Sequence, residues 1–465
     1  MPDLKVYNTL TRSKQEVKPW GGDVIRIYSC GLTVYDFAHI GNLRKYIFDD
    51  VLVRTLKFLG YKTKHVMNIT DVGHLTSDAD EGEDKVEKGA RREKKSAKEI
   101  AIFYEQAFVS DLKQLNILLP DEMPRATENI QEQIDLVKKL EKKGFTYKTS
   151  DGVYFDTARF KDYGKLSGLS KQKLQEGARV KKNPEKKNPT DFALWKFSSK
   201  NGSVQDSAAP RRQMEWESPW GVGFPGWHLE CSAMATKFLG QPFEIHTGGV
   251  DHIGVHHTNE IAQSEAAEGK PLAKYFIHSE HLLQDGRKMA KSEGRFLRLE
   301  DLQKKGFDPL DFRFLCLLAH YRSKLDFTFT SLQAARVARK KLNEFYWEGA
   351  ESGKGELYLD EFKKILGDDL QTPRALSSIF TLIAKAQKGE EQAGAVRSFL
   401  AKADEVLAVI GEKPIIPEEV RELVQRRNKQ RQERDFTGAD KTREKIEALG
   451  YGVEDADGET SVKKR

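Results

Sequence analysis

Cysteine is scarce in this chain, whose 465 residues contain 3 cysteines, at positions 30, 231 and 316. So few thiols cannot form the paired framework of a small secreted domain, and a reducing compartment fits the chain best. Long apolar runs are also missing, so the sequence offers no conventional membrane span of about 20 residues. The first residues, MPDLK, lack the basic and then apolar layout of a secretory signal. We therefore expect a cytoplasmic protein that does not associate with a membrane.

Neither sign of charge dominates. The chain carries 77 Lys and Arg residues against 71 Asp and Glu residues, for a net charge of +6. A small excess spread over such a length permits an anionic partner but does not by itself indicate nucleic acid. The length exceeds what one compact core accommodates, so about two to four domains are expected.

The sequence alternates between strand and helix patterns, as is typical of a parallel α/β fold. Residues 23–29 have the β-branched and aromatic content of a strand. Apolar residues recur with helical spacing over 43–59, and a second strand pattern follows at 65–69. Strand patterns return at 243–246 and 275–283. We interpret these segments as two halves of one α/β domain, whose ligands bind at the carboxyl ends of its strands.

The two halves are separated by residues 127–219, which we interpret as an inserted domain. Within it, residues 198–213 hold almost no large apolar side chain and predict a loop. From about Pro309 the pattern is helical nearly to the end of the chain, with few strand signals. The fold class is therefore α/β, followed by an all-α C-terminal region.

A candidate phosphate site lies at the first turn from strand to helix, where the chain reads His39-Ile40-Gly41-Asn42. The N-terminus of a helix presents unpaired N–H groups and the positive end of the helix dipole, which suit phosphate. Gly41 lets the backbone approach a nucleotide closely, and His39 can donate hydrogen bonds as charge develops on the phosphates. The alternative is an ordinary capped helix start.

A second candidate element is the loop Asp285–Gly294, which reads DGRKMAKSEG. Two lysines, Lys288 and Lys291, are three residues apart in this Gly-flanked loop and can place ammonium groups around a triphosphate. Lys291 is the stronger candidate for stabilising the transition state. The alternative is a solvated basic loop.

Four further side chains form a candidate zinc shell: Cys30, Cys231, His256 and Glu260. On a helix, His256 and Glu260 share one face because they are four residues apart. Thiolate, imidazole and carboxylate groups are all zinc ligands. His257 is a competing ligand, although it is three rather than four residues from Glu260. The alternative is that the cysteines and the histidine are separate core residues.

These motifs together resemble a known enzyme family. HIGN at 39–42 and KMAKS at 288–292 are similar to the HIGH and KMSKS signature pair of class I aminoacyl-tRNA synthetases. The segments CGLTVYDFAHIGN, MNITD, DFALWK, ESPWG, PGWHLECSAM and VHHTNEIAQSE resemble the cysteinyl-tRNA synthetase family in order and spacing, over essentially the whole chain. Asn42 and Ala290 depart from the two signatures, and we expect them to tune the rate rather than abolish activity.

The resemblance implies an ATP-dependent ligase, expected as a monomer, that forms cysteinyl adenylate and transfers it to tRNA(Cys). One zinc ion on the four residues named above would bind the thiolate of L-cysteine, and Mg²⁺ would accompany ATP. Because zinc prefers sulfur to a hydroxyl, serine would be rejected without an editing domain. The resemblance also assigns ATP contacts or catalysis to His39, Gly41, Asn42, Lys288 and Lys291, the ribose to Gly249 and Asp251, and the substrate cysteine to Gly31, Thr33, Thr70, Trp227 and His246.

The same resemblance implies a Rossmann-type nucleotide-binding domain that is split by an insertion and followed by a helical bundle. The expected segments are 1–126 for the first half of the catalytic domain, 127–219 for the inserted connective domain, 220–300 for the second half with the KMAKS loop, 301–335 for a stem-contact region, 336–410 for the helical bundle and 411–465 for an anticodon-binding region.

Two other functions fit part of the sequence. A ligase that transfers cysteinyl adenylate to a small amine would share the catalytic half, but the long helical region after Pro309 argues against it. A catalytically inactive homologue that senses cysteine or tRNA would have lost zinc or phosphate ligands. Here the zinc-ligand candidates, His39 and both loop lysines remain.

Overall fold

The computed structural model describes residues 3–73, 85–168, 184–198, 212–289, 296–413, 415–456 and 459–464. Contacts between residues divide the chain into two compact units, Met1–Val409 and Ile410–Arg465. In the described ranges, no helix combines the length and the apolar composition that crossing a membrane requires.

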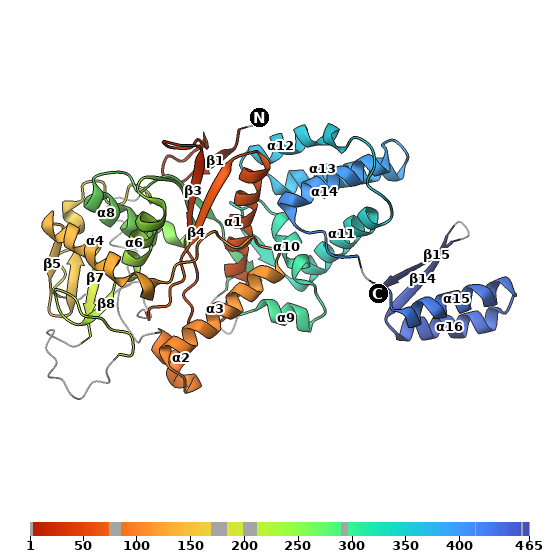
Figure 1. Ribbon diagram of the computed structural model, residues 1–465, viewed down its shortest axis with the longest axis horizontal. Coiled ribbons are helices and arrows are strands. Elements are labelled where there is room, and N and C mark those ends of the chain that lie inside the picture. The colour runs from red at the N-terminus through yellow and green to blue at the C-terminus, as the bar shows by residue number, and fades with distance from the viewer. Residues whose placement is uncertain are drawn as a thin grey trace. The chain divides into compact units, whose positions relative to one another are not determined.

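A four-stranded parallel sheet is the centre of the first unit (Figure 1). Its strands, in spatial order, are β10 (Ala273–Ser279), β9 (Phe243–Gly249), β3 (Val24–Ser29) and β4 (Lys62–Met67). Every neighbouring pair is parallel, so the carboxyl ends lie at one edge. β3 and β9 come from opposite sides of the insertion and pair directly, for example Tyr28 with His246. The predicted split α/β domain is confirmed.

The strand order of the sheet reverses between β3 and β9. The chain adds β4 on one side of β3, whereas β9 lies on the other side of β3 and β10 lies beyond β9. In open parallel sheets, ligands bind outside the carboxyl ends at such a point. Helix α1 (Ile40–Phe58) connects β3 to β4. Its residues Leu52 and Leu56 share one apolar cluster with Ile25 and Ile27 of β3, which fixes α1 against the sheet.

The chain that follows β4 forms helices and then a separate antiparallel sheet, which ends at residue 225. The helices are α2 (Lys85–Glu93), α3 (Ala97–Gln114) and α4 (Ile130–Lys142), and the strands are β5 (Thr146–Lys148), β6 (Gly152–Phe155), β7 (Phe192–Phe197) and β8 (Gly223–Pro225). Trp195 of β7 belongs to the same apolar cluster as Cys30 and Cys231. The inserted sheet therefore shares a core with the metal-ligand candidates. The loop predicted at 198–213 lies, for 199–211, outside the described residues.

Helices precede and follow β9, and a further series of helices follows β10. The elements around the sheet are the hairpin of β1 (Lys5–Asn8) and β2 (Ser13–Glu16), α6 (Trp227–Leu239), α7 (Asp251–Gly254) and α8 (His256–Glu268). A small sheet of β11 (Leu282–Gln284), β12 (Arg287–Lys288) and β13 (Leu325–Phe327) accompanies α9 (Leu299–Lys304), α10 (Pro309–Leu317) and α11 (Phe329–Trp347). In Figure 1, α12 (Leu359–Gly367), α13 (Thr372–Gln387) and α14 (Ala393–Leu407) pack together as a helical bundle.

The second unit consists of α15 (Glu418–Gln432), α16 (Phe436–Ala448), β14 (Tyr451–Ala456) and β15 (Glu459–Lys464). The expectation of helix nearly to the end of the chain is wrong here, because β14 and β15 pair as an antiparallel hairpin. Tyr451 and Val453 alternate along β14 and join the apolar cluster of the two helices. Two apolar residues among many charged ones are too short a pattern to indicate a strand.

Candidate metal and nucleotide site

The zinc-ligand candidates come together at the carboxyl edge of the parallel sheet. Cys30 is the first residue after β3, and Cys231 lies in the second turn of α6. His256 and Glu260 lie one turn apart at the start of α8, on the shared helix face that their spacing predicts. All these side chains are buried.

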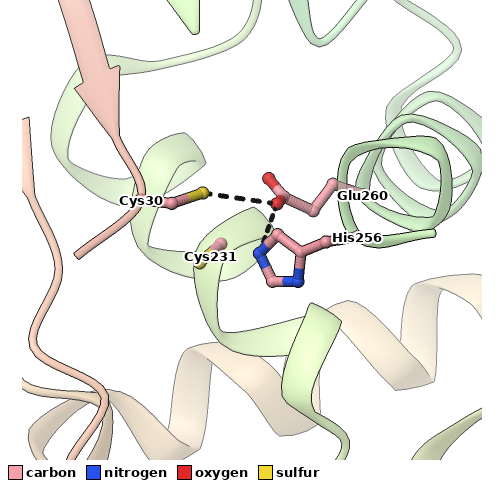
Figure 2. A group of neighbouring side chains, drawn as sticks. All are labelled: Cys30, Cys231, His256 and Glu260. Carbon is pink, nitrogen blue, oxygen red and sulfur yellow. Dashed lines mark hydrogen bonds and ion pairs between the residues drawn. The ribbon is translucent and has the colours of Figure 1, made fainter. Parts of the chain in front are cut away.

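The donor atoms of these residues lie within 4.8 Å of one another. Figure 2 shows the side chains converging, with Glu260 between Cys30 and His256. The Glu260 Oε1 atom is 2.7 Å from His256 Nε2 and 3.7 Å from Cys30 Sγ. Two sulfurs, one nitrogen and one oxygen match the donor number and chemistry of a tetrahedral zinc site. The arrangement can therefore hold a metal ion that accepts soft and borderline ligands.

Burial and mutual contact shift the ionisation of the cluster. Burial raises the pKa of Cys30 well above its ordinary value. A hydrogen bond from Cys30, opposed by burial, lowers the pKa of Cys231 to about 7. Burial acts to lower the pKa of His256, yet the neighbouring Glu260 and Cys231 raise it to about 10. Burial also opposes ionisation of Glu260, but His246 and His256 hold its pKa below the usual range. Of the two neighbouring thiols, the hydrogen bond between them therefore favours the ionised form at Cys231.

A further layer of imidazoles surrounds the cluster. His246 Nε2 is 2.7 Å from Glu260 Oε2, and His246 Nδ1 is 3.2 Å from the carbonyl oxygen of Tyr28. His228 Nδ1 is 3.0 Å from His256 Nδ1. A ligating histidine normally has its second ring nitrogen held by such a partner, which fixes the orientation of the ring. The layer therefore orients both side chains of α8 that face the cluster.

His257, the competing ligand, also lies in this layer. Its Nε2 atom is 3.3 Å from Cys30 Sγ, and its Nδ1 atom is 2.9 Å from His278 Nε2. The donor atoms of Cys30, His246, His257 and Glu260 also lie within 4.8 Å of one another, so a second ligand set exists. The second set contains one sulfur and the first contains two. Because thiolates are strong zinc ligands, the first set suits zinc better.

The predicted nucleotide turn forms the start of α1, and it is capped. His39 Nδ1 accepts a hydrogen bond from the backbone N–H of Asn42 at 3.0 Å, and Asn42 Oδ1 accepts one from the N–H of His39 at 3.2 Å. Asn42 thus completes a reciprocal capping box. A Cβ atom at Gly41 would lie 2.9 Å from the His39 ring, so glycine lets that ring fold over the turn.

Met289 of the KMAKS motif and Leu297, which follows the loop, both reach this turn. The N–H of Ile40 donates to the carbonyl oxygen of Leu297 at 2.9 Å. A Cβ atom on Gly41 would lie 3.7 Å from the sulfur of Met289, which is buried. The two signature motifs, about 250 residues apart in the sequence, therefore meet at one place, as a shared triphosphate site requires.

The structure describes the backbone of only one of the two loop lysines. The backbone of Lys288 belongs to β12, where it pairs with Leu283. Ala290 and Lys291 lie outside the described residues. The contacts of both lysines with ATP stay predictions.

The backbone that follows Cys30 runs beside the backbone that follows β4. The N–H of Gly31 donates to Asn68 Oδ1 at 2.8 Å, and Thr33 forms a parallel bridge with Thr70. A Cβ atom at Gly31 would lie 1.6 Å from the carbonyl oxygen of Asn68, so no other residue fits there without a shift of the backbone. The structure thus brings Gly31, Thr33 and Thr70 together next to Cys30, and their contacts with cysteine stay predictions.

The other predicted substrate residues also lie at this edge of the sheet. Trp227 begins α6, and its ring centroid is 4.7 Å from that of His256, so the indole borders the cluster. Gly249 ends β9, and Asp251 begins α7, where its Oδ1 atom is 2.8 Å from His281 Nε2. Their assignment to the ribose stays a prediction.

A buried charge pair beneath the cluster is indicated by no motif. The Lys45 ammonium group donates to the carbonyl oxygen of Cys30 at 2.7 Å and is 2.7 Å from Asp49 Oδ2. Lys45 and Asp49 lie one turn apart on α1, and both are buried. Their spacing of four residues predicts that they are neighbours on one helix face, but it does not predict that they are buried. The pair links the helix of the nucleotide turn to the backbone of a metal-ligand candidate.

Comparison with known proteins defines the class. A family model described as "tRNA synthetases class I (C) catalytic domain" matches residues 16–337. The solved structure of Mycobacterium tuberculosis methionyl-tRNA synthetase in complex with methionyl-adenylate has a TM-score of 0.55 and 14% identity, and the match covers 83% of this chain and 90% of that one. The split parallel sheet and its nucleotide turn therefore form a class I tRNA synthetase catalytic domain.

Closer relatives narrow the class. Cysteine–tRNA ligase 1 of Burkholderia lata is 48% identical over an alignment of 459 positions that covers 97% of this chain and 95% of the relative. Cysteine–tRNA ligase of Treponema denticola is 41% identical over an alignment of 500 positions, gaps included, that covers 99% of each chain. The chain belongs to the cysteine–tRNA ligase family, and the resemblance seen in its motifs is confirmed.

Proposed function

We propose that this enzyme, acting in the cytoplasm, uses ATP to convert L-cysteine into cysteinyl adenylate and pyrophosphate. It then transfers the cysteinyl group from the adenylate to a ribose hydroxyl of the terminal adenosine of tRNA(Cys), and AMP is released. The observation that supports this proposal most directly is the buried donor set of Cys30, Cys231, His256 and Glu260 beside the start of α1. Activation of cysteine by ATP requires a group that recognises the thiol and, next to it, a turn that binds phosphate.

The donor set fits a zinc ion. Two sulfurs, an imidazole and a carboxylate are zinc ligands. The lowered pKa values of Glu260 and Cys231 favour the negative charge that a dication needs. A bound zinc ion supplies a Lewis acid that lowers the pKa of a substrate thiol and prefers sulfur to a hydroxyl oxygen. Serine would then be rejected at the binding step, because a buried polar site discriminates strongly against a substrate that leaves it unsatisfied.

The residues around the donor set orient the amino acid. Trp227 closes one side, as its contact with the His256 ring suggests. The backbone at Gly31 and Thr33, held against Asn68 and Thr70, would bind the ammonium and carboxylate groups of cysteine. His246 would hold Glu260 in place through its 2.7 Å contact.

The start of α1 binds the triphosphate in this proposal. Its backbone N–H groups and helix dipole attract phosphate, and Gly41 and Asn42 shape the turn. His39 donates a hydrogen bond to the α-phosphate as the cysteine carboxylate attacks it. Lys288 and Lys291, with the Mg²⁺ that accompanies ATP, neutralise the charge on the departing pyrophosphate. Gly249 and Asp251 hold the ribose.

The tRNA is bound by the segments that follow the two catalytic halves, 1–126 and 220–300. We assign 301–335 to the acceptor stem, 336–410 to the supporting bundle and 411–465 to the anticodon, in a monomeric enzyme. Between residues 421 and 445, Lys and Arg outnumber Asp and Glu, which supports contacts with phosphate. Unpaired anticodon bases would supply the specificity.

ATP–pyrophosphate exchange tests the first half-reaction. The purified protein is assayed with cysteine, serine and alanine, and the zinc content of the same sample is measured. Exchange that requires cysteine, with about one zinc ion per chain, is the expected result. Absence of exchange despite bound zinc would favour an inactive sensor, and exchange with another amino acid would contradict the donor-set argument.

Charging of tRNA tests the second half-reaction. A tRNA(Cys) transcript is expected to accept labelled cysteine, and a transcript with an altered anticodon serves as the matched control. Release of a cysteinyl amide with a small amine, without charging of tRNA, would instead identify a small-amine ligase.

The role of Lys291 has its own test. Lys291→Ala is expected to slow adenylate formation much more than it weakens cysteine binding, because the ammonium group acts on developing charge. Equal losses in the two measurements would contradict that role.

A further inference from the structure

A histidine at the carboxyl edge of the parallel sheet is held between two carboxylates. His281 lies between β10 and β11, and its Nε2 atom is 2.8 Å from Asp251 Oδ1. Its Nδ1 atom is 2.8 Å from Glu280 Oε1, which also accepts a hydrogen bond from the backbone N–H of His281 at 3.0 Å. We name Glu280, His281 and Asp251 the edge triad.

Both ring nitrogens of His281 face an acceptor. A neutral imidazole has one N–H group and can donate to only one of the two carboxylates, whereas the imidazolium ion donates to both. Hydrogen bonds between ionised groups are also shorter and stronger than neutral ones. The arrangement therefore favours the charged ring, and the ring fixes the direction in which the carboxylate of Asp251 points.

The exposed fraction of the side chains decreases along the edge triad. The side chain of Asp251 is 53% exposed, whereas those of His281 and Glu280 are 23% and 22% exposed. Burial acts to raise the pKa of Glu280, but the hydrogen bonds from His281 lower it. A ligand can thus reach Asp251, while the two residues behind it are half-buried supports.

The backbone of these two supports is fixed from several sides. The N–H of Glu280 donates to the carbonyl oxygen of Tyr321 at 2.8 Å, and the carbonyl oxygen of His281 accepts from the N–H of Leu325 at 3.2 Å. The buried guanidinium group of Arg44 donates to the carbonyl oxygens of both Glu280 and His281. Arg44 lies on α1, which begins at the candidate nucleotide turn. One helix therefore holds both the turn and the edge triad.

There is room for a ligand near Asp251. Gly249 ends β9 two residues earlier, and in the described part of the chain a Cβ atom built on it would meet no atom within 4 Å, chain neighbours aside. Packing does not require glycine at this position, so the glycine leaves space for a ligand to approach the backbone. A carboxylate can accept about four hydrogen bonds, so the contact of Asp251 with His281 is compatible with a ribose hydroxyl at the same carboxylate.

We propose that His281 and Glu280 are positioning residues that orient the carboxylate of Asp251 to accept a hydroxyl group of the ATP ribose. They act through Asp251 and leave the transfer of the adenylyl group to the nucleotide turn and the KMAKS loop. A carboxylate that is already held in one orientation loses less freedom when the sugar binds. The inference rests on the proposed function, in which Asp251 binds the ribose.

The test compares ATP with its 2′-deoxy and 3′-deoxy analogues in cysteine-dependent pyrophosphate exchange by the full chain. The wild type should use at least one analogue about tenfold less efficiently than ATP, because Asp251 then lacks the hydroxyl that donates to it. His281→Phe keeps a ring but has no N–H group. Its KM for ATP should rise about tenfold, with kcat within about threefold of the wild type, because the lost contact serves binding.

The preference for ATP over the poorer analogue is the decisive readout. In His281→Phe, kcat/KM for that analogue should fall by less than about threefold, since the hydroxyl is already missing, so the preference for ATP decreases. Asp251→Asn combined with His281→Phe should lose no more of this preference than Asp251→Asn alone, because both changes act on one contact.

Two milder variants and a control accompany this comparison. His281→Gln keeps an N–H donor for Asp251 and should restore part of the preference. Glu280→Gln keeps an acceptor for His281 but removes its charge, and the preference should decrease about threefold. Glu265→Gln is the matched control, because Glu265 is a half-buried glutamate whose Oε2 atom is 2.5 Å from Lys165 Nζ. It should leave both KM and the preference unchanged.

Equal falls in kcat/KM for ATP and for the analogues in His281→Phe would show a purely structural role and overturn the inference. Additive losses in the double variant, or a wild type with no preference for ATP over either analogue, would do the same. If His281→Phe loses zinc, the decision rests on Glu280→Gln, in which an unchanged preference overturns the inference. The proposed function fails separately, when the wild type shows no cysteine-dependent exchange.

Discussion

The cluster of metal-ligand candidates (Cys30, Cys231, His256 and Glu260) and the candidate nucleotide turn (His39–Asn42) lie at the same edge of one sheet, yet they are built in different ways. The cluster brings together residues as far apart as Cys30 and Glu260, which are 230 positions apart, and it is buried. The turn consists of four consecutive residues, His39–Asn42, held by a local capping box. A buried cluster of distant donors depends on every member, whereas a local turn retains most of its backbone donors when one side chain changes. We therefore expect substitutions in the cluster to affect the choice of amino acid, and substitutions in the turn to affect the rate.

Cys231→Ser should have the largest effect. Loss of one thiolate should release zinc, abolish the preference for cysteine over serine and lower cysteine-dependent exchange by about 10³-fold or more. Zinc content and exchange with both amino acids are the measurements. Cys316→Ser is the matched control, because Cys316 is a buried thiol whose pKa burial raises to about 12 and which lies outside the donor set. Full zinc occupancy with selectivity intact would contradict the role of Cys231.

His39→Ala should lower kcat for exchange by about 10²-fold, through loss of a donor to the phosphates, while zinc content stays normal. His39 also caps α1, so the effect must be separated from capping. His39→Ser keeps an acceptor for the cap and removes the imidazole. A wild-type rate in the serine variant would show that His39 only caps the helix. The expected difference between the turn and the cluster would then be wrong.

His65 lies in β4 of the parallel sheet that positions both the cluster and the turn, and it makes the stability of this sheet depend on pH. Its ring is 2.8 Å from Ser29 Oγ, and burial, with the nearby Lys45, lowers its pKa from 6.5 to about 3. The unfolded chain takes up a proton below pH 6.5, and the folded chain does not until about pH 3. The free energy of unfolding should therefore decrease as the pH falls, by about 2 kcal/mol at pH 5 from this residue alone.

Urea unfolding of the wild type and of His65→Gln, at about pH 8 and about pH 5, measures this contribution. The variant should lose less stability than the wild type between the two pH values. An identical loss in both proteins would show that His65 does not carry the dependence.

The smallest effect is expected from the charge pair that joins the two features. Lys45→Met combined with Asp49→Asn removes both charges, so no unpaired charge is left in the core. The carbonyl of Cys30 then loses its donor, and zinc should be released to a chelator about tenfold faster. Lys57→Met, an exposed change on the same helix, is the control. Unchanged release would show that the pair does not position Cys30.

The local parts of the site are the parts that the sequence predicts well. HIGN is a contiguous turn, and the spacing of His256 and Glu260 places them on one helix face whatever the rest of the fold does. The parallel sheet follows from strand and helix patterns of ordinary length. The proximity of Cys30 to Cys231 could not be predicted in this way, because it depends on the pairing of β3 with β9 across the insertion. Only the family resemblance supplied that relation.

Other features depend on packing that no short pattern encodes. A lysine on a helix is normally exposed, so the burial of Lys45 follows only from the arrangement of α1 against the sheet. The capping role of Asn42 depends on the backbone angles of the turn. The hairpin at Tyr451–Lys464 offers too few alternating apolar residues to be distinguished from a polar tail.

The division of the parallel sheet between two distant parts of the chain affects how the protein folds during its synthesis on the ribosome. Ribosomes add about 5–20 residues per second, so about 10–50 s separate the synthesis of Cys30 from that of Glu260. Until β9 emerges, the nascent sheet has β4 beside β3 and an open strand edge on the other side. The inserted antiparallel sheet has time to form in this interval. A metal ion that needs all four donors would therefore bind only after Glu260 has been synthesised, late in the production of the chain, and until then Cys30 would lie beside an unpaired strand edge.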